Sequence, residues 1–357
     1  MKHWIKTLIA CVGLISLAPG AHAIILMATG DPTANTTEPA GELARSGWQW
    51  VGKWGKTTGV AVAPKYFLTV KHVGGNILDP FTYRGQTYGA VKFYDDPQTD
   101  LRLVLVTGTF PDYASLYTNT DELGRSVVVI GRGTQRGAPL YVSQNASLVL
   151  KGWEWGPADS VQRWGENRVS SILRNLDGGV ETLAMKFDRD AGPNEAHASP
   201  GDSGGGMFMQ DGLVWKLAGM INTTEGAYSL GPTGPALYGA VFDQGGLYTG
   251  GNPSWRLTDD TFFDQPGRFF CIRTTARLEW IRGVIGSSLT GSPPLVQSAA
   301  SPRGPFIDRL DATVDAPSQA ISFPVVDSQQ FYRLRGAQAR HITGIQVREG
   351  LVWLTYD

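Results

Sequence analysis

The sequence predicts an all-β protein, built as a barrel or a sandwich and closed by one late helix. Short β-branched and aromatic runs alternate with turn residues, and the 357 residues include 45 glycines and 21 prolines. Helical periodicity is scarce. Its best example is residues 275–285, where Leu278, Ile281 and Ile285 recur on one face. Many short strands with a single helix favour a closed or layered β architecture.

Ten runs are predicted to be strands. Six precede the helix: Val60–Val62, Tyr66–Val70, Leu101–Val106, Val127–Ile130, Leu213–Ile221 and Leu237–Phe242. Four follow it and predict a small β-meander: Ala320–Val326, Gln330–Arg335, Ile342–Val347 and Leu351–Tyr356. A polar stretch rich in proline and serine predicts a linker at 287–305. We therefore expect a main domain at 24–286 and a small β module, of unknown role, at 306–357.

Residues 1–23 resemble a secretory signal peptide. Lys2 and Lys6 give a positive start, residues 8–17 form an apolar stretch too short to span a bilayer, and Ala21-His22-Ala23 has the small-x-small pattern of a cleavage site. No later run approaches about 18 uninterrupted apolar residues, the length that a membrane helix needs. We expect an exported protein, secreted, periplasmic or on the cell surface, without a membrane span.

Removal of this segment changes the charge and the cysteine count. The formal net charge of −1 becomes −3 when Lys2 and Lys6 are lost, and no basic patch suggests a nucleic-acid partner. Cys11 is lost as well, so Cys271 remains alone and no intrachain disulfide can form. Because phenylalanine and isoleucine flank Cys271, we expect a buried, inert thiol.

The strongest chemical signal is the run Gly201-Asp202-Ser203-Gly204-Gly205. A nucleophilic serine needs a sharp turn that exposes its hydroxyl, and nearby backbone N–H groups free to hold an oxyanion. We assign Ser203 as the nucleophile and the N–H groups of Gly201 and Ser203 as the oxyanion hole. A side chain at position 201 would crowd the approaching carbonyl.

A catalytic serine also needs a base, for which imidazole has a suitable pKa. Three histidines remain after removal of the signal peptide. His341 lies in the distal module, and His197 is only six residues before the serine, too close to be the usual partner. His72 is therefore the expected base.

The imidazole in turn needs a carboxylate that fixes its tautomer and stabilises its cation. Asp100 is the expected carboxylate because it directly precedes an apolar strand that could carry it into a dry site. Its rivals, Asp95 and Asp96, precede a proline and are expected to be solvated turn acids.

Together these motifs resemble those of trypsin-like serine proteases, in the chain order His, Asp, Ser. The family's Thr-Ala-Ala-His-Cys motif appears as Thr69-Val70-Lys71-His72-Val73, its Asp-(Ile/Leu)-Ala-Leu segment as Asp100-Leu101-Arg102-Leu103, and its Gly-Trp-Gly turn as Gly131-Arg132-Gly133. The serine motif is complete except that Gly206 replaces the usual proline. The resemblance covers about residues 24–286, and Val73 in place of cysteine is typical of disulfide-free bacterial members. It implies two six-stranded β-barrels with the active site between them and a C-terminal helix.

The resemblance also implies an activation device. Cleavage after Ala23 would free the amine of Ile24, which would pair with the carboxylate of Asp202 and order the oxyanion loop. The alternative is that residues 24–45 are a polar lead-in and that other donors satisfy Asp202.

By position in the family, His197 would lie at the floor of the primary specificity pocket, and Asn222-Thr223-Thr224 would replace the Ser-Trp-Gly strand that lines it. Glu195 would favour a basic substrate side chain, and a protonated His197 an acidic one. A surface-loop role for both is the alternative. The segment 153–167 has no clear counterpart, and we expect an elaborated loop near the second barrel.

The leading prediction is an exported serine endopeptidase that acts on polypeptides through an acyl-enzyme. A catalytically weak, protease-like binding or adhesion module and an esterase using the same triad are the alternatives. The glycines of 131–137 do not follow the dinucleotide-binding spacing, so no nucleotide site is expected there. We expect neither a cofactor nor a metal.

Overall fold

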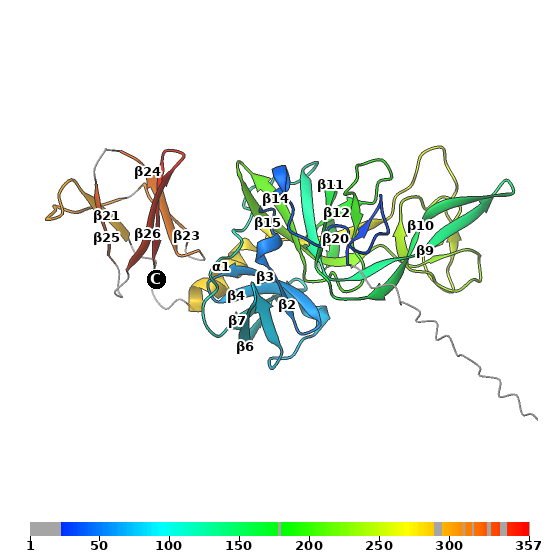
Figure 1. Cartoon of the computed structure of the whole chain (residues 1–357), viewed down its shortest axis with the longest axis horizontal. Coiled ribbons are helices and arrows are strands. Elements are labelled where there is room, and N and C mark those ends of the chain that lie inside the picture. The colour runs from blue at the N-terminus through cyan, green and yellow to red at the C-terminus, as the bar shows by residue number, and fades with distance from the viewer. Residues whose placement is uncertain are drawn as a thin grey trace, which may run out of the picture.

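The computed structural model describes residues 23–177, 180–288, 295–309, 311–315, 318–326, 330–335 and 341–356. Residues 1–22 of the predicted signal peptide and residues 289–294 of the predicted linker lie outside the described residues. About half of the described residues form strands, and two closed antiparallel barrels make up the main domain (Figure 1).

The first barrel closes in the strand order β2-β3-β4-β7-β6-β5. Its six strands are β2 (Val51–Trp54), β3 (Thr57–Ala63), β4 (Tyr66–Val70), β5 (Pro80–Tyr83), β6 (Gln86–Asp95) and β7 (Leu101–Val106). β4 is buried at every residue because its two faces meet different partners. Phe67 joins a cluster confined to this barrel, whereas Leu68 joins a cluster shared with the second barrel.

The second barrel closes in the order β11-β12-β20-β15-β14-β8. Its strands are β8 (Ser126–Gly131), β11 (Arg163–Asp177), β12 (Val180–Lys186), β14 (Gly206–Asp211), β15 (Val214–Thr224) and β20 (Arg268–Arg273). The predicted pair of six-stranded barrels is confirmed, and each of the six runs predicted before the helix overlaps a strand.

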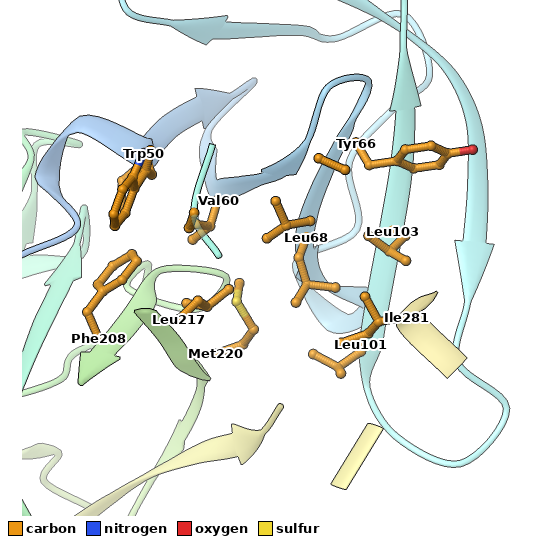
Figure 2. Packing of buried hydrophobic residues seen from close by; sticks show 14 of the residues in the cluster. Trp50, Val60, Tyr66, Leu68, Leu101, Leu103, Phe208, Leu217, Met220 and Ile281 are labelled. Atoms are coloured by element: carbon orange, nitrogen blue, oxygen red, sulfur yellow. The ribbon is translucent and has the colours of Figure 1, made fainter. Parts of the chain in front are cut away.

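One hydrophobic cluster joins the two barrels and the helix that follows them. The first barrel contributes Val60 and Leu68, the second Phe208 and Leu217, and α1 (Leu278–Ser288) contributes Ile281 (Figure 2). The predicted helix at 275–285 appears as a 3-10 turn at Thr275–Arg277 followed by α1. Further 3-10 turns span Gly41–Leu43, Trp48–Trp50 and Lys71–Val73.

Two insertions in the second barrel pair with each other. A long hairpin of β9 (Thr134–Gln144) and β10 (Ser147–Ala158) projects from the barrel, and β17 (Gly239–Val241) extends it into a three-stranded sheet (Figure 1). The expectation of an elaborated loop at 153–167 is therefore wrong: these residues end β10 and begin β11.

Short strands complete the domain. β1 (Ile25–Leu26) pairs with β13 (Ala196–His197), and β16 (Tyr228–Ser229), β18 (Tyr248–Thr249) and β19 (Arg256–Leu257) form a small sheet.

The C-terminal module consists of two small sheets around one core. The first has the order β22-β21-β25, from β21 (Leu295–Ala299), β22 (Ile307–Asp308) and β25 (Phe331–Arg335). The second has the order β23-β24-β27-β26, from β23 (Thr313–Asp315), β24 (Ala320–Pro324), β26 (Ile342–Arg348) and β27 (Leu351–Tyr356). The predicted meander is wrong in topology, because β24 pairs with β27 instead of its next neighbour in sequence. The predicted linker at 287–305 is also too long, since β21 lies within it.

A hydrogen bond joins the C-terminal module to the main domain. The Tyr113 hydroxyl, in the segment after β7, donates to the Ser318 carbonyl over 2.6 Å. Within the described part of the chain, no helix is long and apolar enough to cross a membrane.

The shared cluster predicts a large cost for truncating Phe208, whose ring lies 5.9 Å from that of Trp50. Phe208→Ala should lower the free energy of unfolding by about 3–5 kcal/mol, because it removes a fully buried ring and leaves a cavity. Urea unfolding measures the change. Phe262→Ala is the matched control: its ring is 95% exposed, so the change should stay within about 0.5 kcal/mol. Equal losses in the two variants would contradict the described interface.

Candidate active site

His72 and Asp100 are held together at the end of a strand ladder. Val70, the last residue of β4, pairs with Leu101 at the start of β7, so the residues just beyond this pair are neighbours. The His72 amide donates to Asp100 Oδ1 over 3.0 Å, and the imidazole Nδ1 contacts Oδ2 of the same carboxylate. With Nδ1–H directed at Asp100, Nε2 is the nitrogen left to accept a proton. The His72 side chain is 46% exposed and that of Asp100 17%, so the imidazole can be reached from solvent.

The loop that carries Ser203 packs against the same region of the first barrel. A Cβ atom on Gly204 would lie 2.4 Å from both the Thr58 carbonyl oxygen and Thr69 Oγ1, which only glycine allows. Thr69 lies on β4, three residues before His72, which is in the 3-10 turn that follows this strand. The structure thus brings the serine loop of the second barrel against β4, the strand directly before the turn that carries His72. The Ser203 hydroxyl donates to the Asn222 carbonyl over 3.1 Å.

The backbone of this loop leaves two amides unused. The N–H groups of Asp202, Gly204 and Gly205 donate to carbonyls of Ser199, Ile221 and Asp202. By contrast, the N–H groups of Gly201 and Ser203 have no hydrogen-bond acceptor among the described residues. Gly201 has φ +94°, a conformation that L side chains rarely adopt. These are the two amides predicted to hold an oxyanion.

Asp202 is fully buried and accepts hydrogen bonds from three parts of the chain. Its Oδ2 accepts from the Ile24 amide (3.3 Å) and from the amide and hydroxyl of Ser199 (2.8 and 2.9 Å), and its Oδ1 accepts from the Gly133 amide (2.7 Å). Glycine at 131 and 133 permits this approach, because a Cβ on either residue would lie within 2.8 Å of the carboxyl group. Burial raises the pKa of the Asp202 carboxyl to about 6, although these donors oppose the shift.

The loop before Asp100 contains an interaction that the sequence did not reveal. Asp96 was expected to be a solvated turn acid, but its side chain is 0% exposed. Arg277 donates to both of its oxygens over 2.6 and 2.7 Å, and Lys71 Nζ donates to its carbonyl over 2.9 Å. The expectation holds only for Asp95, whose side chain is 47% exposed and pairs with Arg102. No local signal marks a partner 181 residues away.

Glu195 and His197 are buried, and their polar atoms bond to neighbouring protein groups. Glu195 Oε1 accepts from the side-chain amide of Asn167 (2.9 Å) and the backbone amide of Asp188 (3.0 Å), and burial raises its pKa to about 8. The His197 ring lies 2.6 Å from the Ala198 carbonyl oxygen through Nδ1, and burial lowers its pKa to about 4. His197 is 1% exposed and Glu195 4%, so neither forms part of a surface loop.

The other predicted pocket residues lie at the end of β15. Asn222 and Thr224 are partly buried and Thr223 is exposed, and this segment pairs with β20 through Thr224 and Phe269. Because Asn222 also accepts the Ser203 hydroxyl, the strand lies directly beside the serine.

No family model and no curated protein matches the chain. Among solved structures, a serine-to-alanine mutant of Rv3671c from M. tuberculosis, in an inactive form, is 16% identical with a TM-score of 0.40, over 73% of this chain and 96% of that chain. Another inactive form of the Rv3671c protease is 17% identical with a TM-score of 0.35, over 52% and 86%. Neuropsin, a serine protease expressed in the limbic system of mouse brain, is 14% identical with a TM-score of 0.40, over 68% and 97%. The roles of individual residues rest on the contacts within this chain.

The buried, neutral imidazole of His197 predicts a loss of stability in acid. The folded pKa of about 4 is below the unfolded value near 6.5, so stability falls as the pH drops from 6.5 to 4 and the unfolded state takes up a proton. The contribution is about 3 kcal/mol at pH 4. Urea unfolding at pH 7 and pH 4 should show this loss in the unmodified protein and not in His197→Gln. The comparison between variants is needed because the raised pKa values of Glu195 and Asp202 act in the opposite direction. An equal acid loss in both proteins would contradict the described burial.

Proposed function

We propose that the chain is an exported serine endopeptidase, with Ser203 as nucleophile, His72 as general base and then acid, and Asp100 as the carboxylate that orients His72. The observation that carries the proposal is the pairing of the His72 amide and imidazole with one carboxylate, beside a loop with two unused amides. Such an arrangement suits acyl transfer, which needs a base aimed at a hydroxyl and donors for a developing oxyanion.

In the proposed reaction, Ser203 Oγ attacks the substrate carbonyl carbon, and its proton passes to His72 Nε2. The carbonyl oxygen becomes an oxyanion that accepts from the N–H groups of Gly201 and Ser203. Collapse of this intermediate breaks the C–N bond, and His72 returns the proton to the leaving amine. Water then repeats the sequence on the acyl-enzyme and frees Ser203. Asp100 stabilises the imidazolium throughout and stays ionised.

The proposal requires the Ser203 hydroxyl to turn from the Asn222 carbonyl towards His72. Catalytic hydrogen bonds are often absent or long before substrate binds, so the observed bond to Asn222 is compatible with it. A polypeptide substrate would lie along the exposed edge at Thr223, where an extended strand can pair with backbone groups.

The triad proposal predicts that Ser203→Ala abolishes labelling by a fluorophosphonate probe and hydrolysis of a peptide library. Asp100→Asn should lower kcat by about 10⁴-fold, because the amide favours the wrong imidazole tautomer. Ser126→Ala, at an exposed serine, is the matched control and should keep full activity. A protein that labels at Ser203 and cleaves esters but no peptide would be an esterase. A folded protein without labelling would be a binding module, and the proposal would fail.

We further propose that cleavage after Ala23 activates the enzyme by freeing the amine of Ile24. The support is that the Ile24 nitrogen faces the buried carboxylate of Asp202, which also accepts from the amides of Gly133 and Ser199. A new ammonium at this position would offset the cost of burying the carboxylate charge, and so favour the observed oxyanion loop.

The backbone of Ile24 gives this proposal a second support. Its φ is +50°, and a β-branched residue in the left-handed region is strained by about 1–3 kcal/mol. Cleavage of the preceding peptide bond removes the carbonyl whose clashes define this strain. Ala23 and Ile24 are 0% and 2% exposed, so the bond between them is hidden in the folded domain. Cleavage before folding, as a signal peptidase performs during export, fits this burial.

The activation proposal predicts that one extra residue before Ile24 is inhibitory. A chain that begins Ala23-Ile24 should turn over at least about 100-fold more slowly than one that begins at Ile24, because the oxyanion loop loses its charged partner. Peptide hydrolysis measures the difference. Removal of the extra alanine by an aminopeptidase, before refolding, should restore turnover. Equal turnover of the two chains would leave Asp202 with a structural role alone.

A further inference from the structure

The turn that carries His72 is fixed firmly on the side where it joins β4. There the Lys71 amide donates to the Asp100 carbonyl over 2.6 Å, and the His72 amide donates to the carboxylate of the same residue. On the other side, the chain leaves the turn through Gly74 and Gly75, whose φ angles are +71° and +83°. Because glycine backbones adopt many conformations, this side needs an anchor if the imidazole is to keep one position.

Arg102 supplies a noncovalent anchor on that side. Its Nη1 donates to the Gly74 carbonyl over 2.8 Å. The turn itself has no thiol for a disulfide, because Val73 stands where the motif of trypsin-like serine proteases has a cysteine. Arg102 in turn stands where the family's Asp-(Ile/Leu)-Ala-Leu segment has an alanine. The anchor is therefore a feature of this chain and not of the family's motifs.

Two further contacts hold the guanidinium of Arg102 in place. Its Nε and Nη2 donate to the two carboxylate oxygens of Asp95 over 2.6 and 2.9 Å, and Asp95 lies directly opposite Arg102 in the β6–β7 ladder. The guanidinium also lies 4.6 Å from the centre of the Phe93 ring. The Arg102 side chain is 13% exposed, so water competes little for these bonds. A guanidinium held by a two-point bond and an aromatic ring is a pre-organised donor.

The Phe93 ring connects Arg102 to the second glycine after the turn. Phe93 lies edge-on to Trp54, with the ring centres 5.3 Å apart. A Cβ atom on Gly75 would lie 2.2 Å from an atom of the Trp54 ring, so the glycine backbone is in close contact with that ring. Arg102 and Trp54 therefore hold two successive residues where the chain leaves the turn.

We propose that Arg102, oriented by Asp95, is a positioning residue for His72 in the proposed serine peptidase. Its bond to Gly74 fixes the far side of the turn, so that the imidazole Nδ1 stays directed at Asp100 and Nε2 stays available for the proton of the serine. Arg102 does not touch the substrate and takes no part in proton transfer. The inference rests on the proposed peptidase function and adds the group that holds its base in position.

Arg102→Ala should lower kcat for a peptide substrate at least about 10-fold, because a displacement of about 1 Å in a reacting group can cost about 100-fold. KM should change by less than about threefold, since the arginine does not bind substrate. Turnover is expressed per Ser203 that a fluorophosphonate labels at its end point, so unfolded protein does not enter the value.

Arg189→Ala is the matched control. Arg189 also bonds to both oxygens of one carboxylate, that of Asp264, over 2.8 and 3.0 Å, and its guanidinium lies 4.4 Å from the centre of the Phe242 ring. It lies in the segment between β12 and β13 of the second barrel. Loss of this pair should leave both kcat and KM unchanged.

Asp95→Ala tests the orienting carboxylate separately. The Asp95 side chain is 47% exposed, so its removal should cost little stability. It should lower kcat at least about threefold with KM unchanged, because the guanidinium loses its two-point bond. This variant decides the proposal if Arg102→Ala does not fold.

The outcomes separate this inference from the function on which it rests. A lower kcat with an unchanged KM in the Arg102 and Asp95 variants, but not in the Arg189 variant, supports the inference. Full kcat per labelled Ser203 in a folded Arg102→Ala overturns it, whatever the change in stability. Equal losses of kcat in the Arg102 and Arg189 variants also overturn it. An unmodified, folded protein whose Ser203 does not label overturns the proposed function, and the positioning role with it.

Discussion

The candidate site depends on the contact between the two barrels. His72 and Asp100 belong to the first barrel and Ser203 to the second, so no local structure can bring them together. The cluster that contains Leu68, Phe208 and Ile281 supplies the contact, and each such buried side chain contributes roughly 1.5–3 kcal/mol of hydrophobic stabilisation (Figure 2). α1 lies in this cluster too, which explains why a helix at the end of the main domain matters to a site built from strands.

Buried carboxylates further fix the positions of the loops that carry the candidate site residues. The carboxylate of Asp96, four residues before Asp100, is held by Arg277 from the turn that precedes α1. A buried pair of this kind adds little net stability, but it fixes one arrangement of the groups that it joins. The position of Asp100 is therefore coupled to the end of the main domain. In the same way, the carboxylate of Asp202 fixes the loop that carries Ser203 relative to Ile24 and Gly133.

Sequence patterns predicted the features that depend on residues close together in the chain. The apolar runs at β4 and β7 and the period of α1 follow from short stretches, and the motifs around His72, Asp100 and Ser203 indicated which side chains to compare. Partners distant in the chain were not predictable from such patterns. The sequence around Asp96 is typical of a solvated turn acid, but in the structure its carboxylate pairs with Arg277. Glu195 was a candidate pocket acid, but its carboxyl accepts from the side-chain amide of Asn167. The module's topology was mispredicted for the same reason, since adjacent runs in sequence need not pair.

The hairpin of β9 and β10 helps to hold the short strand β1 in place. Arg136, on β9, donates to the carbonyls of Leu26 and Met27 over 3.3 and 3.1 Å, and its guanidinium lies 4.1 Å from the centre of the Trp153 ring. The hairpin therefore holds β1 against the barrel, directly after the residue that faces Asp202. A strand of only two residues would otherwise gain entropy by leaving its site. Because the hairpin offsets that tendency, the Ile24 nitrogen can stay beside a buried carboxylate with only two paired residues to hold it there.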